Sequence, residues 1–174
     1  RGEGDGLLNA GGDDRATVVG DGGILVEIET TEWTGSGYAK ELHLVAADET
    51  MSLLMDVRNG VVRVIADTTG ILIQIRDPYG GDYGIHYLDR ATGSVRRVTP
   101  AGTSYARSPF LTASTIGYLI GQANSETIVW QSRAGDASSS LSLGYNVVQA
   151  ITDGQTVAWT SSDTPFYRLH YRPA

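Results

Sequence analysis

The sequence contains no cysteine, so the chain has neither a disulfide framework nor a thiolate metal site. No apolar run approaches the roughly 18 to 20 residues that are needed to span a bilayer. Basic residues are also few. With 13 of them against 20 acidic residues, the net charge of −7 argues against nucleic acid or an anionic membrane as the main partner. The chain does not begin with methionine, so we expect a processed protein or a piece of a longer one.

Turn-forming residues are abundant, with 22 glycines among 174 residues. Between residues 83 and 121, short apolar runs alternate with turns such as Asp89 to Gly93 and Thr99 to Gly102. The best candidate for a helix, residues 38–47, follows neither a helical face nor strict alternation. The pattern therefore predicts an all-β protein.

A triplet of residues recurs along the chain. It is found as Leu42-His43-Leu44, Ile85-His86-Tyr87, Ile128-Val129-Trp130 and Leu169-His170-Tyr171, with spacings of 43, 43 and 41 residues. Periods in the forties with four short strands per unit are typical of β-propeller blades, because one small sheet cannot bury both faces alone. The repeat therefore predicts a β-propeller.

The repeat divides the chain into four four-stranded blades within a single domain, residues 1–174. We place the blades at about 16–57, 61–100, 108–143 and 147–174. The last blade is one strand short, and we favour a ring in which the N-terminal strand, residues 7–10, completes it beside residues 167–172, which would hide two open sheet edges. Two alternatives remain: two chains forming an eight-bladed ring, and a chain that is part of a longer propeller.

Several segments carry a family resemblance. Val98-Thr99-Pro100, residues 150–161 (AITDGQTVAWTS) and residues 85–89 (IHYLD) resemble the repeats of TolB-like (WD40-like, PD40) β-propellers. The similarity covers about residues 61 to 172, and the Ser-Pro-Asp-Gly turn of that family appears nowhere intact. The resemblance implies the propeller fold and the binding of proteins, peptides or glycans, and it implies no reaction.

Metal binding and catalysis find little support in the sequence. His43, His86 and His170 share one repeat position and therefore belong to separate blades, whereas metal ligands must lie within about 2.1 Å of one ion. Aspartates in Gly-rich segments, such as Asp67, are interpreted as turn formers rather than calcium ligands. The chain has no Gly-x-Ser-x-Gly elbow. We predict no metal, no cofactor and no enzymatic activity.

Aromatic residues gather in the loops that a propeller presents on one face, namely the connections from second to third strands and from fourth to first strands. Tyrosine, tryptophan and arginine dominate binding hot spots, and aromatic rings also stack on sugars. The predicted binding residues are Trp33, Tyr38, Tyr79, Tyr83, Tyr105, Arg107, Tyr145, Phe166 and Tyr167.

Together these features predict a non-catalytic binding or assembly module that engages a protein, peptide or glycan through its aromatic loop face. One alternative is the propeller portion of a larger enzyme such as a peptidase, and another is a structural subunit of an extracellular or cell-surface assembly. The expected partners include a second copy that completes a larger ring, and exclude nucleic acid and membrane insertion. An extracellular, cell-surface or periplasmic location is favoured.

Overall fold

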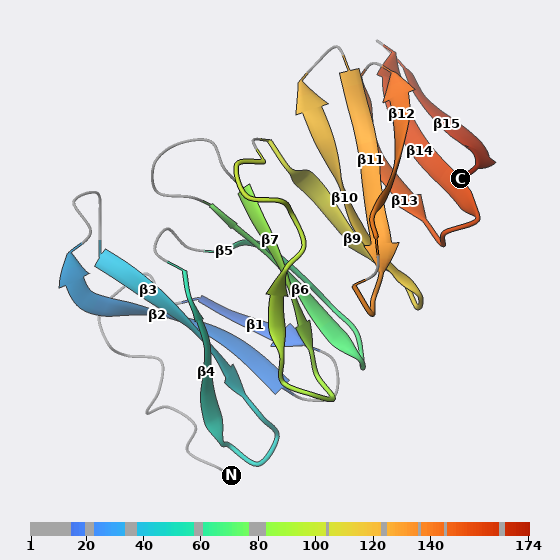
Figure 1. Ribbon diagram of the computed structural model, residues 1–174. Helices are drawn as coiled ribbons and strands as arrows, with labels where there is room; N and C mark the ends of the chain where they lie inside the picture. Colours follow the sequence, from blue (N-terminus) through green and yellow to red (C-terminus); the bar gives the residue numbers. More distant parts are fainter. Residues whose placement is uncertain are drawn as a thin grey trace.

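The computed structural model describes residues 15–19, 23–33, 38–57, 61–76, 83–103, 105–122, 125–135, 137–144, 146–163 and 166–174 (Figure 1). These residues form fifteen β-strands and no helix, which confirms the all-β prediction. Consequently, the described part of the chain offers no helix of the length and apolarity that a membrane crossing requires.

The strands form four antiparallel sheets, each built from consecutive strands. Sheet 1 consists of β1 (Arg15–Val19), β2 (Gly23–Trp33), β3 (Tyr38–Val45) and β4 (Met51–Asp56). Sheet 2 consists of β5 (Val61–Ala66), β6 (Gly70–Arg76), β7 (Tyr83–Asp89) and β8 (Val95–Arg97). Sheet 3 consists of β9 (Arg107–Leu111), β10 (Thr115–Gln122), β11 (Ser125–Ser132) and β12 (Ser139–Gly144). Sheet 4 has three strands, β13 (Val147–Thr152), β14 (Thr156–Asp163) and β15 (Phe166–Pro173).

The turns between strands are closed by aspartate side chains, as the sequence predicts. Asp67 Oδ1 accepts hydrogen bonds from the backbone N–H groups of Thr69 and Gly70. Asp153 Oδ1 accepts them from Gln155 and Thr156 in the same way. These bonds give the chain a local partner at the point where it reverses, so the strands on either side start in register.

The four sheets follow one another in a row (Figure 1), and three apolar clusters join them. The first cluster lies between sheets 1 and 2 and includes Leu25 and Ile73; the second lies between sheets 2 and 3 and includes Tyr118. The third lies between sheets 3 and 4 and includes Leu119 and Val157. The sheets are too small to form separate cores, so each one is stabilised by burying its faces against its neighbours.

Strand β6 shows the effect of this stacking on sequence. Every side chain from Ile71 to Gln74 is buried, because one face of sheet 2 packs on sheet 1 and the other on sheet 3. A strand covered on both sides loses the alternation of polar and apolar residues that marks a half-exposed strand. The nearly continuous apolar run in β6 is therefore a consequence of its position in a sheet that is covered on both faces.

The row of sheets is open in the part of the chain that the structure describes. Sheets 1 and 4 lie at its two ends, lower left and upper right in Figure 1, and three clusters serve four sheets. The predicted pairing of residues 7–10 with residues 167–172 lies outside the described residues. The number of blades in the complete ring and its closure by the N-terminal strand stay predictions.

Candidate functional site

The antiparallel order places one set of connections on the same edge of all four sheets. In each sheet the second strand ends and the third strand begins at this edge, which we call the loop edge. The first strand of a sheet also begins there, and the fourth strand, where present, ends there. Trp33, Tyr105, Phe166 and Tyr167 belong to it and are exposed. Of the other predicted binding residues, Tyr79 and Tyr145 lie outside the described residues, as do the side chains of Tyr38 and Tyr83.

Several of these residues lie on strands rather than in loops. Strand β2 continues through Trp33, and β15 begins at Phe166, so both hairpins are tighter than the sequence suggested. Trp33 belongs to sheet 1 and Phe166 to sheet 4, at opposite ends of the row (Figure 1). The predicted residues therefore share an edge without forming one compact patch.

Arg107 marks the best-organised point on the loop edge, where sheets 3 and 4 meet. Its Nη2 lies 2.6 Å from Oε1 of Glu126 and donates to the carbonyl oxygen of Val147 at 2.7 Å. One guanidinium thus joins three strands, β9, β11 and β13. The arginine side chain remains about one-third exposed, while the glutamate side chain is almost fully buried.

The carboxylate of Glu126 is only half satisfied. Its second oxygen, Oε2, is buried and has no hydrogen-bond partner in the described part of the chain. Buried polar atoms are nearly always paired in folded proteins, so an unpaired one calls for a specific explanation such as a missing ligand or water. The unpaired oxygen sets this point apart from the ordinary joints between sheets.

Backbone strain gathers around the same point. Tyr105, Ser108 and Asn146 have φ values of 61°, 48° and 54°, in the left-handed region that non-glycine residues rarely adopt. Such conformations cost free energy and cluster at functional sites. We define the junction site as Tyr105, Arg107, Ser108, Glu126 and Asn146. It offers an exposed aromatic ring and a fixed guanidinium, which suit binding.

Sequence reasoning found two of these five residues, Tyr105 and Arg107. Glu126 was missed because it is an isolated acidic residue at the start of an apolar strand, and its partner precedes it by 19 positions. No local pattern distinguishes such a residue from a solvent-exposed one. The pairing of β9 with β10 and of β10 with β11 brings the two side chains together.

The histidines lie apart, as the repeat predicts. His43, His86 and His170 belong to sheets 1, 2 and 4, on β3, β7 and β15. Burial lowers the pKa of His86, and the positive charge of Arg97 lowers it further. Among the described residues, no three potential ligands of the types His, Cys, Asp or Glu are grouped as a metal site requires.

One serine and one histidine do meet. Ser161 Oγ lies 2.8 Å from His170 Nε2, between strands β14 and β15. The serine is buried, and the imidazole stacks on Trp159 with ring centroids 5.0 Å apart. A catalytic serine must reach a substrate and its histidine must be oriented by a third group. The burial of Ser161 and the stacking of His170 on the sheet suit packing better than nucleophilic attack.

A pocket of about 340 Å³ lies along the first strands of sheets 2, 3 and 4. It is mostly apolar, with Arg63 among its lining residues, and it extends over β13 onto the outer face of sheet 4. Its volume is within the usual range for small-molecule sites. Sequence reasoning missed it, because its lining comes from β5, β9, β13, β14 and β15. Its apolar lining residues include Ile65, Leu111, Ile151, Ala158 and Leu169.

Comparison with known proteins gives the class of the fold. No protein-family model and no curated sequence matches the chain. Among solved structures, it is similar to the β-propeller domain of the Trilobed protease from Pyrococcus furiosus, described as having an open velcro topology (TM-score 0.64, 8% identity, 92% of this chain and 57% of that one). It is also similar to the acylaminoacyl peptidase of Pyrococcus horikoshii (0.57, 10%, 86% and 28%) and to TolB from Acinetobacter baumannii (0.53, 15%, 92% and 40%).

These likenesses show a fold of the β-propeller class, TolB-like in its arrangement. Sequence identities of 8 to 15% support a shared fold and no statement about function. The chain spans between 28% and 57% of the length of these structures. The propeller predicted from the 43-residue repeat is thereby confirmed as a fold class, and the specific repeat family stays a prediction.

Proposed function

We propose that the chain is a non-catalytic binding module of the β-propeller class, and that it engages a protein or peptide at the loop edge. The observation that carries this proposal is the junction site, where the exposed Tyr105 ring stands two residues from an Arg107 guanidinium fixed by Glu126 and Val147. Preorganised aromatic and arginine side chains are the usual centres of binding energy, because little side-chain entropy is lost on contact.

The chemistry of the site indicates what it binds. Arg107 still has donors to offer to a carboxylate or a carbonyl group, since one-third of the side chain remains exposed. Tyr105 supplies an aromatic face next to it. A peptide segment that combines an acidic or carbonyl acceptor with an apolar side chain matches both groups, and Trp33 provides a second aromatic contact further along the edge.

A displayed library of random peptides, selected against the immobilised chain, tests this proposal. Peptides that are enriched should bind in titration calorimetry, and Tyr105→Ala should weaken them at least about tenfold, the loss that a hot-spot truncation produces. Trp33→Ala should weaken the longer peptides. The matched control is Gln155→Ala, an exposed residue in the β13–β14 turn on the opposite edge. Failure to enrich any peptide, or equal affinity in Tyr105→Ala, would overturn the proposal.

A glycan ligand is examined with the same variants. Neutral hexasaccharides are titrated while tryptophan fluorescence is followed, because Trp33 is exposed and responds to stacking. Saturable binding that is lost in Trp33→Ala and kept in Gln155→Ala would replace the peptide with a sugar as the ligand.

The second candidate is the propeller portion of a larger enzyme. It is favoured by the likeness to peptidase structures of which the chain spans only 28% to 57%. In that arrangement the reacting groups would belong to flanking sequence. Peptidase activity of the full-length gene product, absent from this segment alone, would support the enzyme.

A further inference from the structure

The recurring triplets occupy the same place in every sheet, since each lies on its third strand. In the first three sheets, the first and third residues of the triplet belong to the apolar cluster that joins the sheet to the next one. These residues are Leu42 and Leu44, Ile85 and Tyr87, and Ile128 and Trp130. The triplet is therefore the contact that a sheet makes with its successor.

The fourth triplet carries the same residue types and has no successor in the structure. Leu169 is 73% exposed and Tyr171 is 78% exposed. Their counterparts Ile85, Tyr87 and Ile128 are between 0% and 2% exposed. A leucine and a tyrosine at positions that are buried or half-buried in the other repeats indicate a face suited to packing against another sheet.

The rest of this face is equally uncharged. Strand register places Ile151, Ala158 and Tyr171 side by side on it, and Thr160 beside Leu169. We call it the end face. Its residues are Gln149, Ile151, Ala158, Thr160, Ser162, Tyr167, Leu169 and Tyr171. Much of its inner part also lines the pocket described above.

The opposite end of the row presents a matching surface. Ile71 and Ile73 of β6 are fully buried against sheet 1, and the corresponding residues of β2 are Ile24 and Val26. Among the described residues, however, no earlier sheet covers them, and Ile24 is 37% exposed. We call this the start face. Register adds the other residues, which are Ile28, Glu41, His43, Val45, Met51, Leu53 and Asp56.

The start face is mainly apolar, with its charges at one end. Met51 and Leu53 are 48% and 58% exposed on the outer strand β4. Glu41 Oε2 lies 2.9 Å from His43 Nε2, at the end of the face nearer the β2–β3 link. The remaining area offers aliphatic side chains of the kind that the triplet residues of sheets 1 to 3 meet in the following sheet.

We propose that the end face of one copy docks on the start face of a second copy, and that two copies close a ring of eight sheets. The same type of joint occurs three times inside the chain, so a fourth is a continuation of an interface already present. Within one copy the two faces lie at opposite ends of the row (Figure 1). Head-to-tail contacts of this kind give closed rings when the rotation closes. The inference stands apart from ligand binding at the junction site.

The test is the mass of the chain in solution, measured by light scattering and sedimentation over a hundredfold range of concentration. The wild-type chain should approach twice its 18.5 kDa mass and then stop increasing. Tyr171→Glu on the end face and Leu53→Glu on the start face should each remain monomeric, because each leaves a charge buried in both joints. Gln155→Glu adds the same charge away from both faces and should still dimerise.

Mixing the two variants gives the decisive result. The Leu53→Glu chain keeps a wild-type end face, and the Tyr171→Glu chain keeps a wild-type start face. One of the two joints is therefore intact in the mixture, and a one-to-one pair should form although neither variant pairs with itself. Far-ultraviolet circular dichroism and thermal unfolding verify that both variants are folded, since both residues are exposed in the single chain.

Other outcomes overturn the proposal. A wild-type chain that stays monomeric throughout would show that the faces await a different occupant, such as further sheets of a longer chain. Dimers of Leu53→Glu beside monomers of Tyr171→Glu would indicate a symmetric contact between end faces. Mass that keeps rising with concentration would show an open polymer in place of the closed ring.

Discussion

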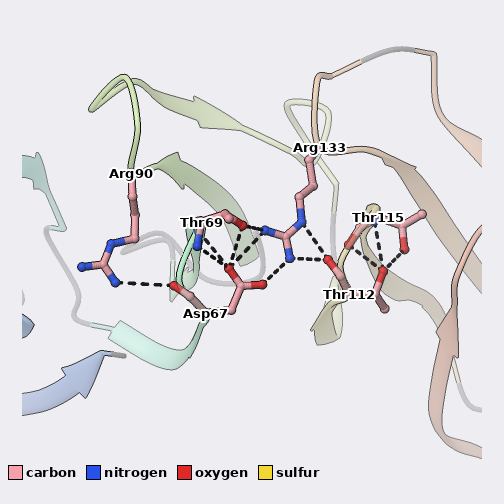
Figure 2. Close-up of polar contacts among 7 residues, drawn as sticks. Asp67, Thr69, Arg90, Thr112, Thr115 and Arg133 are labelled. Atoms are coloured by element: carbon pink, nitrogen blue, oxygen red, sulfur yellow. Dashed lines mark hydrogen bonds and ion pairs between the residues drawn. The ribbon is translucent and has the colours of Figure 1, made fainter. Parts of the chain in front are cut away.

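The guanidinium of Arg133 binds the carboxylate of Asp67 across the boundary between sheets 2 and 3, although the two residues are 66 positions apart in the chain (Figure 2). Nη1 donates to Oδ1 at 3.1 Å, and Nη2 forms the ion pair with Oδ2. Nε of the arginine also donates to the carbonyl oxygen of Thr112 at 2.7 Å. Arg133 thus fastens the β5–β6 turn of one sheet to two segments of the next.

Replacing Asp67 by asparagine should lower the free energy of unfolding by about 1 kcal/mol, because a partly exposed ion pair is screened by solvent. Asparagine keeps an oxygen for the backbone N–H groups of Thr69 and Gly70, so the turn survives. Alanine removes those bonds too and should cost about 1 kcal/mol more. Urea unfolding at neutral pH measures both. Asp48→Asn is the control, because Asp48 Oδ1 accepts a hydrogen bond from the backbone N–H of Thr50 in an exposed turn. An equal loss of unfolding free energy in this variant would contradict the role of Arg133.

The ion pair of Asp67 and Arg133 also predicts that the free energy of unfolding falls at low pH. Hydrogen bonds from Arg133 hold the pKa of Asp67 well below its usual range, so the unfolded chain takes up this proton at a higher pH than the folded chain does. The stabilisation is therefore complete above about pH 4, the unfolded pKa, and is lost as the pH falls below it. Urea unfolding of the wild type and Asp67→Asn should converge in that range. A constant difference between them down to low pH would refute the assignment.

His86 should make the protein less stable in mild acid. Burial lowers its pKa, so at pH values just below about 6.5 the unfolded chain binds a proton that the folded chain does not. Stability contributed by this group is complete above that pH and falls as the pH decreases. His86→Gln should lose this part of the dependence of stability on pH. Thermal melts between neutral pH and mildly acidic pH measure the difference; parallel curves would contradict it.

Gly117 should tolerate no side chain. A Cβ at this position would overlap the ring of Phe110 and the backbone carbonyl oxygen of Val129. The carbonyl oxygen of Val129 belongs to the paired strand β11 and cannot shift without disturbing the sheet. Gly117→Ala should therefore lower the free energy of unfolding by at least about 2 kcal/mol through overpacking. Gly93 is the comparison, because its φ is +70° and an added Cβ would meet nothing within 4 Å. Gly93→Ala should cost about 1 kcal/mol from strain alone. Equal losses in the two variants would argue against the predicted overlap.

The repeat could be predicted from the sequence, but the contacts between the repeats could not. The triplets at 42, 85, 128 and 169 predicted four third strands, and each lies on the expected strand type in a different sheet. Their regularity reflects packing against a neighbour, which every repeat must solve in the same way. The separation of the three histidines followed from the same reasoning.

Contacts that occur only once leave no periodic signal. The pair of Arg107 and Glu126 joins residues of β9 and β11 that are 19 positions apart, a separation unrelated to the 43-residue repeat. The aromatic residues Trp33 and Phe166 were placed in loops because turn composition marks the centre of a hairpin better than its ends. Hydrogen bonding between strands extends β2 and β14 further than composition suggests.

The arrangement of the sheets in one row also determines the order in which they unfold. Sheets 2 and 3 each have two neighbours, whereas sheets 1 and 4 have one in the described structure. In a single copy, opening should therefore start at the outer sheets and move inward, as in a chain of coupled units rather than a globular core. Amide hydrogens of β6 and β10 should exchange last. The protein is held together in its middle and is most easily opened at the surfaces that are suited to receive another molecule.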